Sequence, residues 1–195
     1  QWCSWAASTR LVCQFRIVVN DSGLLLGFSR MIALDADGKR MIKLSQEANS
    51  RSLGQIQNGG SVLDWDIVGK PGQLLMTREY VPERSTGTHI YNELQGLGVD
   101  MVDSISLRRS KIEGPRKGAF EYITDGHGTV RIMGVQVESS GGYDANKVSY
   151  YYRKSGSRDW EKLSSIGLAG GSSEGGFEPY AVDPNKNVVY GFDAE

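Results

Sequence analysis

The sequence predicts an all-β protein, specifically a partial β-propeller of four-stranded antiparallel blades with about three and a half blades in the chain. Three observations predict it: a hairpin pattern that recurs, a nearly constant spacing between its copies, and a second hairpin inside each interval. No helical periodicity competes with this pattern anywhere in the sequence.

The recurring hairpin is clearest at 119–137, AFEYITDGHGTVRIMGVQV, where two apolar runs flank a turn at 125–128. Apolar and β-branched runs around a short glycine-containing turn are typical of a β-hairpin. The same form returns at 62–80, with its turn at 69–72, and at 177–192, with its turn at 183–185. A looser copy occupies 2–19.

The copies of the hairpin recur at a nearly constant spacing. The aromatic residues before the turns are Trp5, Trp65, Tyr122 and Tyr180, which lie 60, 57 and 58 residues apart. A fixed period of this length indicates stacked or radial repeats.

A second hairpin follows within each interval, at 29–45, 99–113 and 148–164. Each period therefore holds about four strands, the content of one propeller blade. We expect a single domain, 1–195, with blades at 1–48, 61–113 and 118–164 and a half blade at 177–195.

The expected propeller is incomplete, because propellers usually close with about four to eight blades. The sequence begins in mid-strand and stops where the second hairpin of the last blade should follow, so both ends look cut. Unpaired strand edges are templates for further pairing, and we therefore expect self-association through open blade edges.

The composition excludes several classes of partner. A net charge of −1 gives no electrostatic reason to expect nucleic acid or an anionic membrane. The longest apolar runs fall far short of the roughly 18 residues of a membrane-spanning helix. No signal-peptide pattern is present, which leaves the compartment open between bacterial cytoplasm and periplasm. No cofactor is predicted.

The two cysteines lie on the first hairpin. With a turn centred on Ala7 and Ser8, Cys3 falls opposite Cys13 across the strands. A cross-strand disulfide is geometrically conceivable, whereas two buried free thiols are the simpler interpretation, and the sequence leaves both open. A metal site is not expected, because no histidine or further cysteine lies nearby in the sequence.

Other polar motifs have ordinary explanations. Asp35 and Asp37 precede Gly38, but the further oxygen ligands of a calcium loop are missing, so turn chemistry explains them. Arg108, Arg109 and Lys111 form a small basic strand face of the kind that is usually solvated.

The histidines are not predicted to be catalytic. His127 sits between glycines in a hairpin turn, and His89 lies in the long insertion at 81–98, where partner or substrate contacts would be expected.

The letters Gly171-Ser172-Ser173-Glu174-Gly175 satisfy G-x-S-x-G, the nucleophile elbow of α/β-hydrolases. That elbow needs a helix directly after the serine, and Gly176 and Pro179 follow here instead. No histidine comes later in the chain, although the hydrolase order requires one. We assign the match to chance and predict no catalytic residue.

Five segments carry a family resemblance: 28–45, GLGVD at 96–100 with VD at 102–103, ITDGHG at 123–128 with VRIMG at 130–134, GSRDW at 156–160, and PYAVDP at 179–184 with YG at 190–191. As a set they resemble the N-terminal β-propeller region of bacterial prolyl oligopeptidase family serine peptidases of the dipeptidyl or acylaminoacyl type.

The resemblance implies a parent enzyme in which a propeller limits access to an α/β-hydrolase domain that carries a Ser-Asp-His triad and cleaves short peptides. That domain is absent from this chain, so the chain alone is not expected to be an enzyme. Its expected partners are the hydrolase domain and the parent's peptide substrate. The alternative is a free-standing propeller-like module that binds a protein or peptide partner, using the insertion at 81–98 and neighbouring loops.

Overall fold

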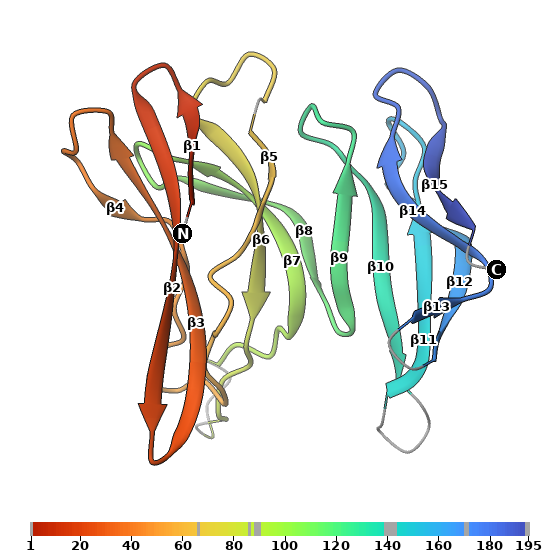
Figure 1. Cartoon of the computed structure of the whole chain (residues 1–195), viewed down its shortest axis with the longest axis horizontal. Coiled ribbons are helices and arrows are strands. Elements are labelled where there is room, and N and C mark those ends of the chain that lie inside the picture. The colour runs from red at the N-terminus through yellow and green to blue at the C-terminus, as the bar shows by residue number, and fades with distance from the viewer. Residues whose placement is uncertain are drawn as a thin grey trace. The chain divides into compact units, whose positions relative to one another are not determined.

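The structure is a computed structural model, and it describes residues 2–65, 67–85, 87, 91–138, 144–169 and 172–193 (Figure 1). Every regular element in these ranges is a β-strand, and the strand pairs are antiparallel, as the sequence predicts. Because these residues form no helix, none of their segments could cross a membrane as one. None of the sheets they form closes on itself.

The chain divides into two compact units, Gln1–Pro115 and Arg116–Glu195. The first unit holds two four-stranded sheets, each with its strands in sequence order. The first sheet consists of β1 (Trp2–Ala7), β2 (Arg10–Asp21), β3 (Leu24–Asp35) and β4 (Ile42–Lys43). The second consists of β5 (Val62–Asp64), β6 (Gln73–Tyr80), β7 (Gly96–Asp103) and β8 (Arg109–Arg116).

The turn between β5 and β6 shows why glycine is needed at the hairpin tips. Gly69 and Gly72 have φ angles of 72° and 80°, which lie in the left-handed region. Glycine enters that region without the steric cost that a Cβ would bring. The hairpin expected at 62–80 therefore forms around the predicted turn.

The core of the first unit lies between its two sheets. Side chains from both sheets form one buried cluster of Ala6, Val12, Met31, Ala33, Leu44, Leu74, Met76 and Val102. Each sheet thus covers an apolar face that it could not bury alone, which is the physical reason for the repeat.

A buried arginine adds a polar joint between these two sheets. Arg10 is only 2% exposed, and its Nε and Nη2 donate to the carbonyl of Ser104 at 2.9 and 2.6 Å. Its Nη1 donates to Oδ1 of Asp35 at 2.8 Å and to the carbonyl of Arg40 at 3.0 Å. The charge is paired and every donor group is engaged, as a buried guanidinium requires.

The second unit holds a five-stranded sheet and a two-stranded hairpin. The larger sheet has the order β13-β12-β11-β10-β9, and the hairpin pairs β14 with β15. The strands are β9 (Ala119–Thr124), β10 (Val130–Glu138), β11 (Asp144–Tyr152), β12 (Glu161–Ala169), β13 (Ser172–Glu174), β14 (Phe177–Val182) and β15 (Val189–Asp193).

The second unit repeats the packing of the first. A buried cluster joins Ile132, Val148, Tyr150 and Ile166 of the larger sheet to Val182 of the hairpin. Arg131 is 3% exposed, and it donates from Nε to the carbonyl of Arg153 and from Nη2 to Oδ1 of Asn187, each at 2.8 Å. Its Nη1 is buried and has no hydrogen-bond partner among the described residues.

One strand departs from the sequence-based expectation. Residues 172–174, which fall between the predicted blades at 118–164 and 177–195, form β13 and pair with residues 167–169 of β12. The sheet therefore has five strands rather than four. Backbone pairing with an exposed sheet edge needs no particular side chain, so composition alone does not reveal it.

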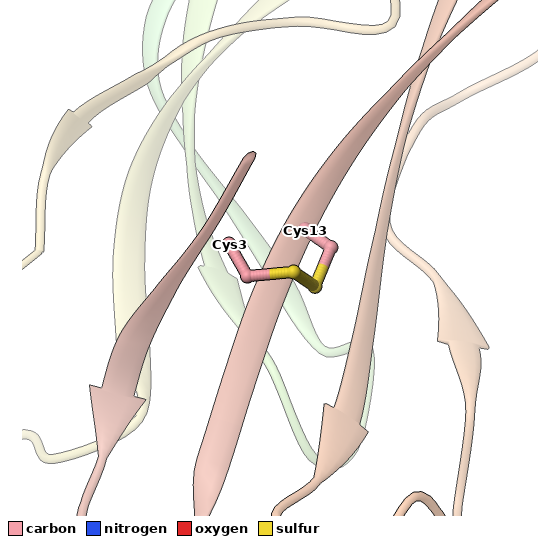
Figure 2. Close-up of a disulfide and its surroundings, with 2 residues drawn as sticks. All are labelled: Cys3 and Cys13. Atoms are coloured by element: carbon pink, nitrogen blue, oxygen red, sulfur yellow. A yellow bond between two sulfur atoms is a disulfide. The ribbon is translucent and has the colours of Figure 1, made fainter. Parts of the chain in front are cut away.

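The simpler interpretation of the two cysteines, as free thiols, is wrong. Cys3 and Cys13 are directly opposed in the β1–β2 register, as predicted, and they form a disulfide (Figure 2). Their Cα atoms are 4.0 Å apart. This is close to the separation of about 4.5 Å typical of a non-hydrogen-bonded antiparallel pair, in which side chains approach most closely.

Candidate functional site

A groove of about 370 Å³ lies beside the β2–β3 hairpin in the first unit. Its lining combines apolar side chains with amides and one cation, principally Gln14, Arg16, Ile17, Phe28, Gln57 and Asn58. A concave surface of this size that combines apolar and polar side chains is typical of a binding site, so we treat the groove as the candidate site.

The hairpin register shapes one wall of the groove. Ile17 is opposite Phe28, and Val18 is opposite Gly27. A Cβ placed on Gly27 would meet no atom within 4 Å. The glycine therefore leaves open space beside Val18 rather than filling a packed position.

The segment 57–61 forms the other wall and is fixed to β3 through Ser29. The Ser29 amide donates to the carbonyl of Gln57 at 2.9 Å, and its hydroxyl donates to Oδ1 of Asn58 at 3.2 Å. The amide of Gly59 donates back to the Ser29 hydroxyl at 3.0 Å. A Cβ on Gly59 would lie 2.4 Å from the hydroxyl of Ser45, so only glycine allows this close approach.

Arg30 lies at the base of the hairpin. Its guanidinium carbon lies 5.4 Å from the centre of the Phe28 ring, within the range of a cation–π contact. Its Nη1 donates to the carbonyl of Ser29 at 2.6 Å. Amides, a cation and exposed apolar side chains together suit an extended peptide, which offers backbone hydrogen bonds and alternating side chains.

A second cluster surrounds Asp100 and is structural. The Asp100 carboxylate is 1% exposed and lies 3.4 Å from Nη1 of Arg78, 3.6 Å from Nη1 of Arg109 and 3.4 Å from the hydroxyl of Tyr80. Arg109 also donates to the carbonyl of Leu44, from the first sheet's side. The cluster therefore links β6, β7 and β8 to the neighbouring sheet.

Burial shifts the pKa of two members of this cluster, Tyr80 and Arg109. It raises the pKa of Tyr80, and the negative charge of Asp100 raises it further. Burial lowers the pKa of Arg109, while the same carboxylate opposes that change. Arg108 and Lys111 are exposed as expected, but the prediction of a solvated face is wrong for Arg109, whose partner lies in another strand.

The second unit contains a partly buried acid, Glu121. The hydroxyl of Tyr150 donates to Oε2 of Glu121 at 3.4 Å. Burial raises the pKa of Glu121, and the hydrogen bond from Tyr150 opposes this in part. Burial also raises the pKa of Tyr150. Nothing in the sequence pattern signals this pair, because its members lie 29 residues apart.

The predicted turn aspartates do not form a metal site. Asp35 accepts from Arg10 at 2.8 Å and from Nε of Arg40 at 2.5 Å, so its carboxylate is already paired with cations. Asp37 pairs with Lys39 at 3.0 Å. In the part of the chain that the structure describes, no group of three or more histidine, cysteine, aspartate or glutamate side chains could hold a metal ion.

The remaining sequence candidates that the structure describes do not lie together. His127 is exposed in its turn, where its amide donates to Oδ1 of Asp125 at 3.0 Å. His89 and Gly171 lie outside the described residues. Ser172 and Ser173 lie on β13, in place of the strand-to-helix turn that a nucleophile elbow needs.

The insertion at 81–98 is described only in part, and its base is tied to the connection at 49–53. Oε1 of Glu83 accepts from Nδ2 of Asn49 at 2.5 Å, and Oε2 lies 3.3 Å from Nη2 of Arg51. The hydrogen bond from Asn49 lowers the pKa of Glu83, and Arg51 adds to this. These contacts fix the start of the insertion, at Glu83, to the connection at 49–53.

Comparison of the chain with protein-family models, with curated proteins and with solved structures finds no significant match.

Proposed function

We propose that this chain is the non-catalytic β-propeller portion of a prolyl oligopeptidase-like serine peptidase, where it limits substrate access to a hydrolase domain outside this chain. The observation that carries the proposal is the succession of antiparallel meanders, which pack on one another within each of the two units. Face-to-face packing of consecutive meanders is what propeller blades require.

The repeated polar joint supports the same assignment. Arg10 and Arg131 are both buried near the start of the second strand of a sheet, and both reach a turn of the following sheet or hairpin. A contact of the same kind in both units favours one common mode of sheet packing within each unit. The sequence resemblance, which spans nearly the whole chain, supplies the link to a peptidase.

The role of the chain in such an enzyme is steric. Sheets that bury both faces against neighbours are stiff, because protein interiors are close-packed. Rigid blades in front of a hydrolase site admit short, flexible peptides and exclude folded proteins by steric hindrance. The Cys3–Cys13 disulfide supports an oxidising location, such as the bacterial periplasm, for this enzyme.

The test compares this chain with the product of its complete gene. Both are incubated with a series of dipeptidyl p-nitroanilides and with a fluorophosphonate probe that labels active serines. We expect release of p-nitroaniline and labelling only with the longer protein, and loss of both when its predicted nucleophile is replaced by alanine. A complete gene that encodes no hydrolase domain would overturn the proposal.

The second candidate function is a free-standing module that binds a protein or peptide partner. The groove beside the β2–β3 hairpin favours it, because Gln14, Gln57 and Asn58 offer amides next to the apolar Phe28. A random library of fluorescent peptides, screened by anisotropy against the chain and its Phe28→Ala variant, tests it. Binding by the wild type that the variant loses would support this function, and no binding would reject it.

A further inference from the structure

The outer half of the β2–β3 hairpin, residues 15–30, projects as an arm beyond its neighbouring strands (Figure 1). β1 pairs with β2 only as far as Gln14, and β4 pairs with β3 only at Ile32 and Ala33. Among the described residues, no other strand pairs with the outer edges of the arm. The arm is therefore held in place only at its base.

One face of this arm is apolar. Residues directly opposed in an antiparallel pair share a face, and the opposed pairs Ile17–Phe28, Val19–Leu26 and Asp21–Leu24 alternate with the pairs of the other face. Ile17 is 52% exposed, Val19 45% and Leu24 63%. A contiguous apolar face left in water marks an interaction surface.

Opposite charges stand at the two ends of this face. Asp21 is at the tip, and Arg30, opposite Phe15, is at the base, where its guanidinium lies over the Phe28 ring. Neither forms an ion pair with any other described residue. Six residue steps separate the two pairs, which corresponds to about 20 Å along the strands.

We propose that this face of the arm is the interface between two copies of the chain, stacked antiparallel about a two-fold axis. The axis passes between the Ile17–Phe28 and Val19–Leu26 pairs, so each of these pairs packs on the other in the second copy. The same operation stacks the Asp21–Leu24 pair of each copy on the Phe15–Arg30 pair of the other, so that Asp21 lies diagonally opposite Arg30, within reach of its long side chain. Stacked sheets lie about 10 Å apart, a gap that side chains from both faces fill.

The charge pattern is the reason for choosing a second copy as the occupant. A two-fold interface must be self-complementary, with one residue meeting another and the reverse contact occurring by symmetry. An apolar centre with a negative tip and a positive base satisfies this condition without any partner of different sequence. The inference stands independently of the proposed function, because it concerns only the first sheet.

The test is sedimentation velocity of the 195-residue chain over a range of concentrations, with circular dichroism to confirm that each variant is folded. Val19→Glu places a carboxylate in the centre of the interface and should give a monomer throughout. The matched control is Leu25→Glu, because Leu25 is 69% exposed and belongs, opposite Asn20, to the other face of the same arm. This control should dimerise as the wild type does.

Exchanging the two charges of the interface provides a second, independent test. Asp21→Arg and Arg30→Asp alone each replace two attractions by repulsions and should weaken the dimer by about fivefold or more. The double variant restores both pairs in reversed sense and should recover the wild-type association. A monomeric wild type, equal effects of Val19→Glu and Leu25→Glu, or a double variant no better than either single variant would overturn the proposal.

Discussion

Arg10 in β2 and Arg131 in β10 play the same structural part in two different sheets. Each guanidinium is almost fully buried, and each connects its sheet to a turn beside the next one, at Ser104 and at Asn187 respectively. They differ in their hydrogen bonding, because every nitrogen of Arg10 has a partner, whereas Nη1 of Arg131 has none in the part of the chain that the structure describes. This difference leads to the first prediction.

Replacing Arg10 by alanine should destabilise the first unit strongly, by about 3–5 kcal/mol, because it leaves the Asp35 charge and the Ser104 carbonyl without their buried partner. Arg131→Ala should cost less, about 2 kcal/mol, since the wild-type side chain already has an unsatisfied nitrogen. Urea denaturation of both variants measures the two losses. An equal or reversed order would contradict the ranking.

Reduction of the Cys3–Cys13 disulfide should lower the free energy of unfolding by about 2–3 kcal/mol, because the bond closes a short loop in the unfolded chain. The measurement is urea denaturation with and without a reductant. The double variant Cys3→Ser/Cys13→Ser serves as control, and its stability should not respond to the reductant. If the stability of the wild type also failed to respond to the reductant, the disulfide would not contribute to the free energy of unfolding.

Glu121 should make the stability of the second unit fall as the pH rises. Burial raises its pKa in the folded chain, so the folded form keeps a proton that the unfolded form loses above the ordinary value of 4.5. The free energy of unfolding therefore decreases from that pH up to the folded-state pKa and is constant above it. Urea midpoints from pH 4 to 8 measure this.

Two variants separate the contribution of Glu121 from the rest. Glu121→Gln should flatten the decline with pH. Glu161→Gln is the control and should leave the decline above pH 4.5 unchanged, because hydrogen bonds from Tyr152 and Lys154 lower the pKa of Glu161 and its contribution varies only below 4.5. A Glu121→Gln curve parallel to that of the wild type would contradict the prediction.

Gly134→Ala should destabilise the larger sheet of the second unit by about 1–3 kcal/mol through overpacking. A Cβ there would lie 2.9 Å from the Phe120 ring and 3.0 Å from that of Tyr150, which hold each other edge to face. The matched control is Gly114→Ala in β8, where a Cβ would meet nothing within 4 Å. Thermal denaturation compares the two, and similar losses would exclude the steric explanation.

The hairpins could be predicted from the sequence because their signals are local. Apolar runs around Gly69 and Gly126 fix both the turns and the pairing of the flanking strands. The opposition of Cys3 and Cys13 followed from the same register. Whether the thiols would join could not be predicted, since the distance between them depends on which kind of antiparallel pair they occupy.

The buried polar contacts could not be predicted, because they join residues that are distant in the sequence. From the sequence, Arg109 belongs to a basic strand face. Its contacts with Asp100 and Leu44 arise only in the folded chain. Arg10 and Ser104 lie 94 residues apart. The groove also escaped prediction, because it needs the segment 57–61 to lie against β3.

The most direct measurement is a structure of the complete gene product determined by electron cryomicroscopy. We predict that the sheets described above form consecutive blades around a central channel, and that the channel opens toward a Ser-Asp-His triad in a hydrolase domain. A linear stack of sheets, or a complete protein without such a domain, would contradict the assignment to a peptidase propeller.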